Sequence, residues 1–260
     1  MLENIFDRMV QQALGCDRLT QRLTKRMIWM HAPIPPSLLR SMLGDAFVVE
    51  TDVVKIELVP PVLDALFPEE REHIARALLK RQAEFATARI CARRALALLD
   101  VTPAPLLSSN DRAPRWPAGI IGSITHGGNC CAVAVARSRE AHSVGIDIER
   151  AVPLPLGAET QICTAGERAW LDRLASADRQ LLATLHFSAK EALYKCQYPV
   201  TGLMIDFLDV QLTIDLGQQR FRIAVCTHQN APWEILRRME GEFRMRQGLI
   251  VTTALLPHFE

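Results

Sequence analysis

Apolar positions return at helical intervals along two long stretches of the chain. From Pro68 to about Asp100, apolar residues recur every three, four or seven positions, which predicts one long helix or two helices in line. A helix start is favoured because Pro68 is followed by Glu69 and Glu70, acids that suit the positive end of a helix. The same kind of spacing predicts mostly helical structure over residues 166–198.

Alternation of apolar and polar residues predicts strands elsewhere. The turn His126-Gly-Gly-Asn129 has the residue types of a hairpin and joins two apolar strands. Pro60-Pro61 ends the strand region that precedes the first long helix. The predicted strands are residues 46–58, as one or two strands, 119–125, 130–136, 143–149, and several between 207 and 256.

Two stretches show neither the helical spacing of apolar residues nor the alternation of a strand. Residues 1–45 place leucines among polar residues and then a proline-rich stretch from His31 to Pro36, which stops any helix. Residues 101–117 contain four prolines and a Ser-Ser-Asn-Asp cluster, and they are predicted to form a loop. Because helices and strands are mixed without a strict βαβ order, the predicted fold class is α+β, and no short repeat is visible.

The composition is that of an ordinary globular protein. The 260 residues include 30 Lys and Arg against 29 Asp and Glu, and this net charge of +1 does not indicate a general binder of polyanions. The longest unbroken apolar run, Cys130 to Ala136, is far shorter than the ~20 residues that cross a bilayer. Charged residues within the first ten positions argue against a secretory leader. We therefore expect no membrane association.

The distribution of the cysteines indicates a reducing cellular compartment. Seven cysteines are scattered along the chain without a C-x-x-C pair, as is typical of a reducing environment in which cysteine acts as a small core residue. The seven histidines are equally dispersed and form no zinc-binding pattern. We expect a cytoplasmic protein.

Two acids share one face of the strand predicted at residues 143–149. Because side chains alternate along a strand, Asp147 and Glu149 point the same way and lie ~7 Å apart. Neighbouring carboxylates repel each other unless a positive group lies between them, and Mg²⁺ accepts carboxylates, waters and substrate phosphates as ligands. The alternative is the solvent-facing side of an edge strand.

A second set of charged residues lies on the helix predicted at residues 166–198. The segment Phe187-Ser-Ala-Lys-Glu-Ala-Leu-Tyr-Lys195 places Glu191 and Lys195 four positions apart on one helix face. Such a pair is commonly a surface ion pair of small energy. The alternative, that the pair lines a cleft, is raised by the apolar residues around it.

Two further segments offer groups that could bind an anion. His126 ends a predicted strand beside two glycines that leave the backbone open to a ligand, although a histidine there could equally be a core or turn residue. Residues 71–94 hold seven Arg or Lys against two Glu, which is either a solvated helix face or an anion site. Arg81 and Arg89 border the apolar stripe and could reach a phosphate at its edge.

Together these segments resemble the 4'-phosphopantetheinyl transferase superfamily. The resemblance is carried by Gly145-Ile-Asp-Ile-Glu149, by the helix motif that begins at Phe187, and by Gly122-Ser-Ile-Thr-His126 upstream, in the order and spacing of that superfamily. Four further segments are similar to the branch of this superfamily that serves siderophore and other natural-product synthetases. They are Phe67-Pro-Glu-Glu, Lys80-Arg-Gln-Ala-Glu-Phe, Arg89-x-x-Ala-Arg-x-Ala-Leu96 and Trp116-Pro. The resemblance covers about residues 45–256.

The resemblance implies a fold and a reaction. The fold is two similar α+β subdomains related by a pseudo-twofold, with coenzyme A (CoA) in the cleft between them. On this basis the chain divides into an N-terminal extension (1–45), an N-terminal subdomain with the basic helix (46–143) and a C-terminal subdomain with the metal site (144–260). The reaction moves the phosphopantetheine arm of CoA to a serine of an acyl, peptidyl or aryl carrier protein and releases 3',5'-ADP. It serves siderophore, polyketide or nonribosomal peptide biosynthesis, and we expect a monomer.

The resemblance also implies roles for the acids. Asp147, Glu149 and Glu191 would bind Mg²⁺, or alternatively Mn²⁺, and the main-chain carbonyl of Ile148 would be a further ligand. Glu191 would take the serine proton, with His126 as the less favoured base.

The CoA contacts implied by the resemblance come from both halves of the chain. Lys195 would be catalytic, because it neutralises the diphosphate and the leaving 3',5'-ADP. The loop 108–116 lacks the lysine that the family often places there, and Arg112 or Arg115 would replace it. The implied CoA-binding residues are Arg81, Arg89, Asp111, Arg112, Thr125, His126, Asp147 and Lys195.

Two other functions stay open from the residues alone. Another Mg²⁺-dependent phosphotransferase or hydrolase could use the same acids, although no P-loop motif is present. A nucleic-acid-binding protein could use the basic helix, but the near-neutral charge and only two tyrosines disfavour it, and we expect no nucleic-acid partner.

Overall fold

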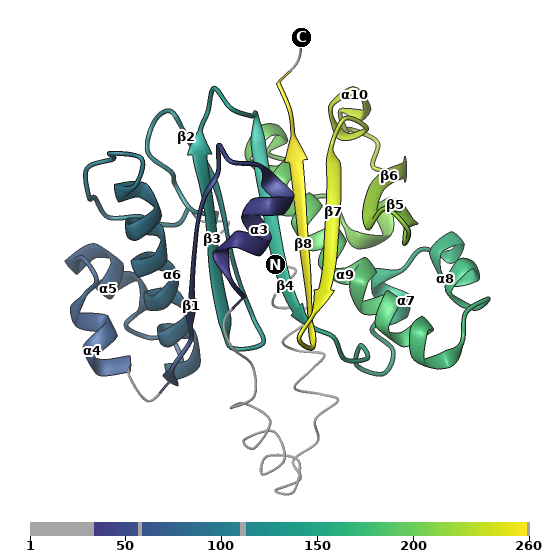
Figure 1. Ribbon diagram of the computed structural model, residues 1–260, viewed down its shortest axis with the longest axis horizontal. Helices are drawn as coiled ribbons and strands as arrows, with labels where there is room; N and C mark the ends of the chain where they lie inside the picture. The colour runs from purple at the N-terminus through teal and green to yellow at the C-terminus, as the bar shows by residue number, and fades with distance from the viewer. Residues whose placement is uncertain (1–33, 57–58, 110–112, 259–260) are drawn as a thin grey trace, which may run out of the picture.

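Two antiparallel sheets, each covered by helices, form the two halves of the molecule (Figure 1). The computed structural model describes residues 34–56, 59–109 and 113–258. The α+β class predicted from the sequence is confirmed, because the strands are antiparallel and the helices do not alternate with them one by one.

The first half is a three-stranded sheet with helices packed against it. The strand order is β1-β3-β2, and both pairings are antiparallel. Helix α6 lies across β1 and β3, and its alanine-rich face is buried against the valines of β3. The elements are β1 (Val48–Val53), α4 (Val59–Asp64), α5 (Pro68–Ile74), α6 (Leu79–Ala97), β2 (Ile120–Gly127) and β3 (Cys130–Arg137).

The second half is a five-stranded antiparallel sheet around one long helix. The strand order is β4-β8-β7-β6-β5. Helix α9 lies across β4 and β8 and contributes many of the buried residues of this half's core. The elements are β4 (Ser143–Arg150), α7 (Glu159–Ile162), α8 (Ala165–Leu171), α9 (Ser176–Thr201), η2 (Phe207–Asp209), β5 (Val210–Asp215), β6 (Arg220–Cys226), α10 (Trp233–Leu236), β7 (Glu240–Arg246) and β8 (Leu249–Leu256).

The two sheets meet along the edges of β2 and β4. Hydroxyls of β2 replace the carbonyls of a regular ladder here. Ser123 Oγ accepts a hydrogen bond from the N–H of Ile146 at 3.1 Å. Thr125 Oγ1 accepts one from the N–H of Ile148 at 3.3 Å. The two strands therefore run in the same direction. Gly127 lies so close to Ile148 that an added Cβ would fall 1.9 Å from its carbonyl oxygen, so only glycine fits at this contact.

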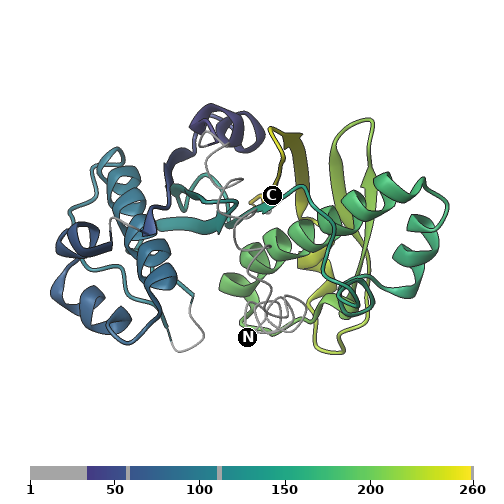
Figure 2. The ribbon, with the colours of Figure 1, turned by 90° about the horizontal axis from the view of Figure 1, so that it is seen from below.

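Helix α3 (Pro36–Leu43) covers this junction between the sheets (Figure 2). Leu249 and Val251 of β8 belong to the core beneath α3, whereas Ile250 belongs to the core around α9, so the two helices lie on opposite faces of β8. The prediction that the proline-rich stretch stops any helix at Pro36 is wrong in one respect. Pro36 is the first residue of a helix, because proline is tolerated in the first turn.

The other predicted elements are present with local differences. The apolar stripe forms two helices, α5 and α6, and the turn of the β2–β3 hairpin places Gly128 and Asn129 at φ of 56° and 66°. Of the predicted strand region 46–58, the described part forms the single strand β1. Pro60-Pro61 lies within the short helix α4, where the sequence alone indicates only a strand end. The predictions for residues 1–33 fall outside the described residues.

Candidate active site

Asp147 lies at the centre of a hydrogen-bonded group between β4 and α9. Its Oδ1 accepts from Lys195 Nζ at 2.8 Å and from Thr125 Oγ1 at 3.1 Å. Its Oδ2 accepts from Ser188 Oγ at 2.7 Å. Asp147 is 3% exposed, so donors on both oxygens compensate the loss of water around a buried carboxylate. Three residues predicted for the site, Asp147, Thr125 and Lys195, are thus brought together.

Thr252 of β8 extends this group. Its Oγ1 lies 2.9 Å from both the carbonyl oxygen and the Oγ of Ser188, and both residues are fully buried. Since the Ser188 hydroxyl donates to Asp147, Thr252 fixes the orientation of the serine that holds the acid. Sequence reasoning missed both roles. The only available signal for Thr252 is a polar residue inside an apolar strand.

Glu149 and Glu191 complete an acidic cluster with Asp147. Burial raises the pKa of Glu149 well above its usual range, the Asp147 and Glu191 carboxylates raise it further, and the Lys195 ammonium lowers it. Glu191 itself is buried in α9. Three carboxylates therefore share a poorly solvated space with the ammonium of Lys195, and their mutual repulsion favours a further cation.

The donor set of the acidic cluster fits a hard divalent cation such as Mg²⁺, since carboxylate oxygens are its usual protein ligands. In the part of the chain that the structure describes, however, no three His, Cys, Asp or Glu side chains are arranged so that they could hold a metal ion. Lys195 lies 2.8 Å from Asp147 and already provides this acid with a positive partner. The acidic cluster therefore fits Mg²⁺ in the type and charge of its donor groups. The main-chain carbonyl of Ile148, which lies between the two strand acids, contacts Gly127.

His126 and Arg81 lie together where β2 ends beside α6. The Arg81 guanidinium is 2.9 Å from His126 Nε2, and Glu84 lies 3.8 Å from both residues. The side chain of Arg81 is 39% exposed, so its charge is accessible to a ligand. Sequence reasoning singled out Arg81 and His126 and missed Glu84, which lies beside both of them at the end of the strand that also carries Thr125.

Arg89 has a different setting from Arg81. It is 4% exposed, its Nε donates to the Leu106 carbonyl at 2.6 Å, and its Nη2 donates to Ser108 Oγ at 3.0 Å. Burial lowers the pKa of Arg89 to about 10, and its guanidinium lies 4.1 Å from the Phe85 ring centroid. Arg89 therefore fixes the loop after α6, and its contact with CoA stays a prediction. Asp111 and Arg112 lie outside the described residues.

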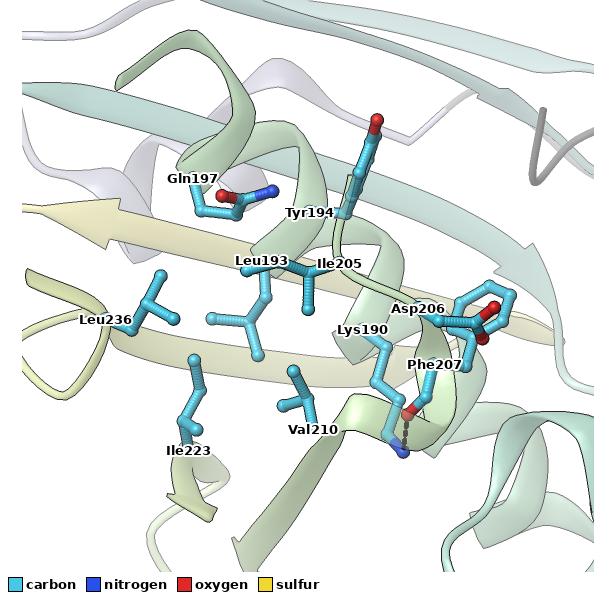
Figure 3. Close-up of a pocket in the computed structure, with 10 residues that line it drawn as sticks. All are labelled: Lys190, Leu193, Tyr194, Gln197, Ile205, Asp206, Phe207, Val210, Ile223 and Leu236. Atoms are coloured by element: carbon cyan, nitrogen blue, oxygen red, sulfur yellow. Dashed lines mark hydrogen bonds between the residues drawn. The ribbon is translucent and has the colours of Figure 1, made fainter. Parts of the chain in front are cut away.

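An apolar pocket lies on the neighbouring face of α9 (Figure 3). It lies between α9, η2 and the sheet. Leu193 and Tyr194 contribute from the helix, and Ile205 and Phe207 from the segment that follows it. The pocket belongs to a different face of α9 from the one that contacts Asp147, because successive helix residues are turned by ~100°.

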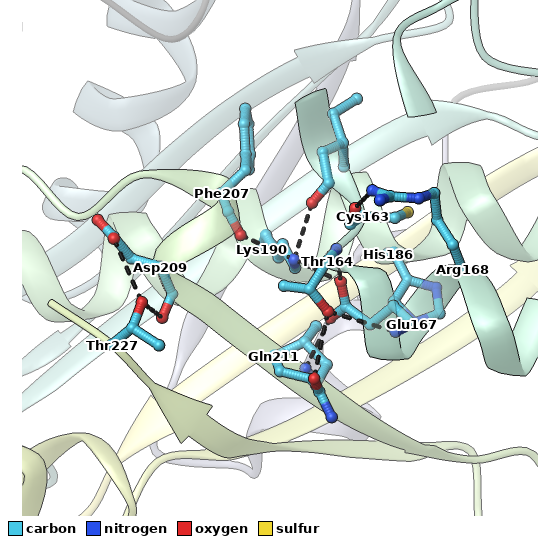
Figure 4. Close-up of polar contacts among 12 residues, drawn as sticks. Cys163, Thr164, Glu167, Arg168, His186, Lys190, Phe207, Asp209, Gln211 and Thr227 are labelled. Atoms are coloured by element: carbon cyan, nitrogen blue, oxygen red, sulfur yellow. Dashed lines mark hydrogen bonds and ion pairs between the residues drawn. The ribbon is translucent and has the colours of Figure 1, made fainter. Parts of the chain in front are cut away.

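Lys190 lines this pocket, and its ammonium is held by Glu167 and by two main-chain carbonyls (Figures 3 and 4). Its Nζ donates to Glu167 at 2.7 Å and to the carbonyls of Ile162 and Phe207 at 2.8 Å. Burial lowers the pKa of Lys190, and Glu167 opposes this shift. The ammonium thus ties α7, α8 and η2 to the residue that precedes Glu191. The sequence motif contains Lys190, but nothing in it reveals this partner.

Comparison with known proteins identifies the family of this chain. A family model described as the 4'-phosphopantetheinyl transferase N-terminal domain matches residues 69–136, and one described as the 4'-phosphopantetheinyl transferase superfamily matches residues 143–249. The chain belongs to the 4'-phosphopantetheinyl transferase superfamily. The first match contains α6, β2 and all of β3 except its last residue, and the second contains Asp147, Glu149, Glu191 and Lys195.

Curated relatives carry matching names. The chain is 42% identical to the 4'-phosphopantetheinyl transferase Svp of Streptomyces mobaraensis over 193 residues, which cover 72% of this chain and 77% of the relative. It is 37% identical to the 4'-phosphopantetheinyl transferase PptT of Mycobacterium tuberculosis over 210 residues, 76% and 88% of the two chains. Enterobactin synthase component D of Escherichia coli is 33% identical over 153 residues, 57% and 69%. None of the described helices is long and apolar enough to cross a membrane.

Proposed function

We propose that this chain transfers the 4'-phosphopantetheine arm of CoA to a serine of an acyl, peptidyl or aryl carrier protein and releases 3',5'-ADP. Family membership supports the reaction, and the buried acidic cluster beside Lys195 supports its place in the molecule. The serine oxygen forms a bond to the phosphorus that carries the pantetheine, the bond from that phosphorus to the 3',5'-ADP oxygen breaks, and the serine proton passes to a base.

The residues of the acidic cluster divide the work. Asp147, Glu149 and Glu191 would hold Mg²⁺, or Mn²⁺, with the Ile148 carbonyl as a further donor, and the cation would withdraw charge from the CoA diphosphate. Glu191 accepts the serine proton, directly or through a water. Lys195 neutralises charge on the diphosphate and on the leaving nucleotide.

The first half supplies positive charge for the nucleotide end of CoA. Arg81 and His126 lie together at the end of β2, one residue beyond Thr125, whose hydroxyl contacts Asp147. A 3'-phosphate bound by this pair would leave the diphosphate free to extend toward the acidic cluster. Arg89, Asp111 and Arg112 complete the proposed CoA contacts.

Other features of the proposal concern the setting of the reaction. We place it in the cytoplasm, supported by the free thiols of the described cysteines, five of which are buried. We also propose a monomer whose two halves are related by a pseudo-twofold. The carrier would belong to siderophore, polyketide or nonribosomal peptide biosynthesis, in keeping with the name of the enterobactin relative.

The observation that carries the proposal is the juxtaposition of Asp147, Glu149 and Glu191 with Lys195 across β4 and α9. The test is intact mass spectrometry of candidate carrier domains incubated with CoA, Mg²⁺ and this protein. The expected result is a carrier heavier by one phosphopantetheine, with no gain when the carrier serine is replaced by alanine. Hydrolysis of CoA without modification of any carrier would instead favour another Mg²⁺-dependent hydrolase.

A further inference from the structure

Two buried acids, one in each half, make the same set of contacts. Glu70 of α5 pairs with Arg93 of α6 at 2.8 Å, and Glu167 of α8 pairs with Lys190 of α9 at 2.7 Å. Each carboxylate also accepts from the N–H at the N-cap of its own helix, at 3.0 and 2.7 Å. In both halves the acid and its cationic partner are 23 positions apart. The two halves therefore share a local framework of a capped short helix tied to a long one.

The sequence repeats in the same register. Glu167 follows Glu70 by 97 positions (167 − 70), and Lys190 follows Arg93 by the same number (190 − 93). With this offset, residues 86–96 (ATARICARRAL) align with residues 183–193 (ATLHFSAKEAL) and are identical at five of eleven positions. The likeness between the two halves is visible in this short segment, and a repeat is therefore hard to recognise from the residues alone. The shared contacts supply the register.

Strand acids occupy matching places beneath the two long helices. Glu50 and Asp52 on β1 correspond at the same offset to Asp147 and Glu149 on β4. Each of these strands has an antiparallel partner within its sheet and packs against the long helix of its half. In the first half Arg94 of α6 neutralises the acids, with Nε 3.1 Å from Glu50 and Nη1 3.2 Å from Asp52.

The residue at the position of Arg94 in the second half is Glu191 (191 − 94 = 97). One half thus places two strand acids beside a guanidinium, and the other places two strand acids beside a third carboxylate. Arginine suits the first arrangement because its planar fork can donate to two carboxylates at once. In the second arrangement the described cationic partner is Lys195, whose Nζ lies 2.8 Å from Asp147 and faces a cluster of three carboxyl groups.

We infer that Glu50, Asp52 and Arg94 form a closed counterpart of the acidic cluster, in which the Arg94 guanidinium provides the positive charge that the second half takes from a divalent cation. This inference rests on the proposed function and deepens it. It predicts that the chain takes up its divalent cation at the second half and not at the counterpart. It also predicts that the residue at one equivalent helix position, Arg94 in the first half and Glu191 in the second, decides which half needs a cation.

The first test compares matched carboxylate-to-amide variants of the full chain. Mn²⁺ is the probe, and the free ion is followed by its electron paramagnetic resonance signal in the presence of CoA. Asp147→Asn is expected to weaken Mn²⁺ binding by about tenfold or more. Asp52→Asn is expected to leave the affinity within about twofold of the unchanged chain, because Arg94 already neutralises that site. Equal losses in both variants would overturn the inference.

The second test exchanges the deciding residue. Arg94→Glu is expected to lower the thermal midpoint in EDTA and to recover part of it in Mn²⁺, since three acids then face each other in the first half. Arg94→Gln is the control, which loses the ion pairs without creating a third acid and should not respond further to Mn²⁺. The inference is wrong if Arg94→Glu folds with a native circular dichroism spectrum and its midpoint is indifferent to Mn²⁺.

The reciprocal exchange covers the case in which Arg94→Glu does not fold. Glu191→Arg is expected to lose the Mn²⁺-dependent rise in midpoint that the unchanged chain shows, while its midpoint in EDTA is not lowered. A Glu191→Arg chain that is less stable in EDTA and still rises with Mn²⁺ would contradict the counterpart. These readouts need no carrier. If the unchanged chain shows them but modifies no carrier, the proposed function fails and the inference about the two halves stands.

Discussion

Helices α6 and α9 show how one framework can end in two different electrostatic settings. Both are long, both pack across two antiparallel strands, and both anchor a buried acid of the preceding short helix. They differ in the charge that they present to the strand acids, which is positive at Arg94 and negative at Glu191. The comparison teaches that packing sets where charges meet, while a single helix position sets whether they cancel.

The anchoring acids also differ in burial. Glu70 is fully buried, but its partner Arg93 keeps 17% of its side chain exposed. Glu167 and Lys190 are 1% and 3% exposed, and Lys190 also satisfies two backbone carbonyls. The second half therefore depends more on its ion pair, because a buried charge that loses its partner has no water to replace it.

The largest effect is expected for the strand acids. Asp147→Ala should lower the rate of carrier modification by about 10³-fold, because it removes a metal ligand and the partner of Lys195. Asp52→Ala, the same change at the matching position of β1, should retain activity within about twofold, because Asp52 pairs with Arg94 and the partly exposed ion pair between them is weak. Intact mass spectrometry of the carrier measures both. Full activity in a folded Asp147→Ala chain would remove the acidic cluster from the reaction.

The anchoring ion pairs provide the second comparison. Lys190→Met should lower the free energy of unfolding by about 3–5 kcal/mol, because Glu167 is left buried with an uncompensated charge. Arg93→Met should cost about 1.5–3 kcal/mol, because water can approach the partly exposed position that Arg93 leaves. Urea unfolding followed by circular dichroism measures both changes. Equal losses would show that the two ion pairs are equivalent despite their different burial.

The first half is expected to recognise the end of CoA that carries the 3'-phosphate. Arg81→Ala should lower the affinity for CoA by about tenfold, because a charge-assisted hydrogen bond to the 3'-phosphate is lost. The same change should lower the affinity for 3'-dephospho-CoA much less. Inhibition of carrier modification by each ligand compares the two affinities. Similar losses for both ligands would contradict the assignment of this phosphate to Arg81.

The smallest effect is expected at His186 of α9, which corresponds to Arg89 of α6 at the same offset of 97 positions (186 − 89). Burial lowers the pKa of His186, so the folded state binds its proton less readily than the unfolded state does. Its contribution to stability is present above the unfolded pKa and is lost as the pH falls through about 6.5 toward the lower folded value. His186→Phe should therefore flatten the fall in stability between pH 7 and pH 5, measured by urea unfolding. An unchanged slope would show that His186 does not titrate in this range.

Much of the fold could be predicted because its signals are local. The stripe after Pro68 gave α5 and α6, and the residues of the turn gave the β2–β3 hairpin, since helix periodicity and turn chemistry depend on near neighbours. Helix α4 and the start of α3 were missed at prolines, where the same residue that ends one element begins the next.

The candidate site was predictable only in part. Asp147, Glu149, Glu191 and Lys195 stand in recognisable motifs, but the motifs do not show that Lys195 binds Asp147 or that Ser188 holds its other oxygen. Arg89 shows the opposite error of reasoning from charge alone. Its position in a basic helix suggests an exposed phosphate ligand, and packing places it inside the protein on the Leu106 carbonyl.

By itself, the sequence determined which residue types were available and in what local order, because helix stripes, strand alternation and the family motifs are properties of neighbouring positions. Tertiary structure decided which charges became partners. Arg94 neutralises acids on β1, and Lys195 reaches an acid on β4, because α6 and α9 were packed across those strands by their apolar faces. Apolar burial is non-directional and brings distant segments together, and only then do distance and desolvation fix the strength of each charge pair.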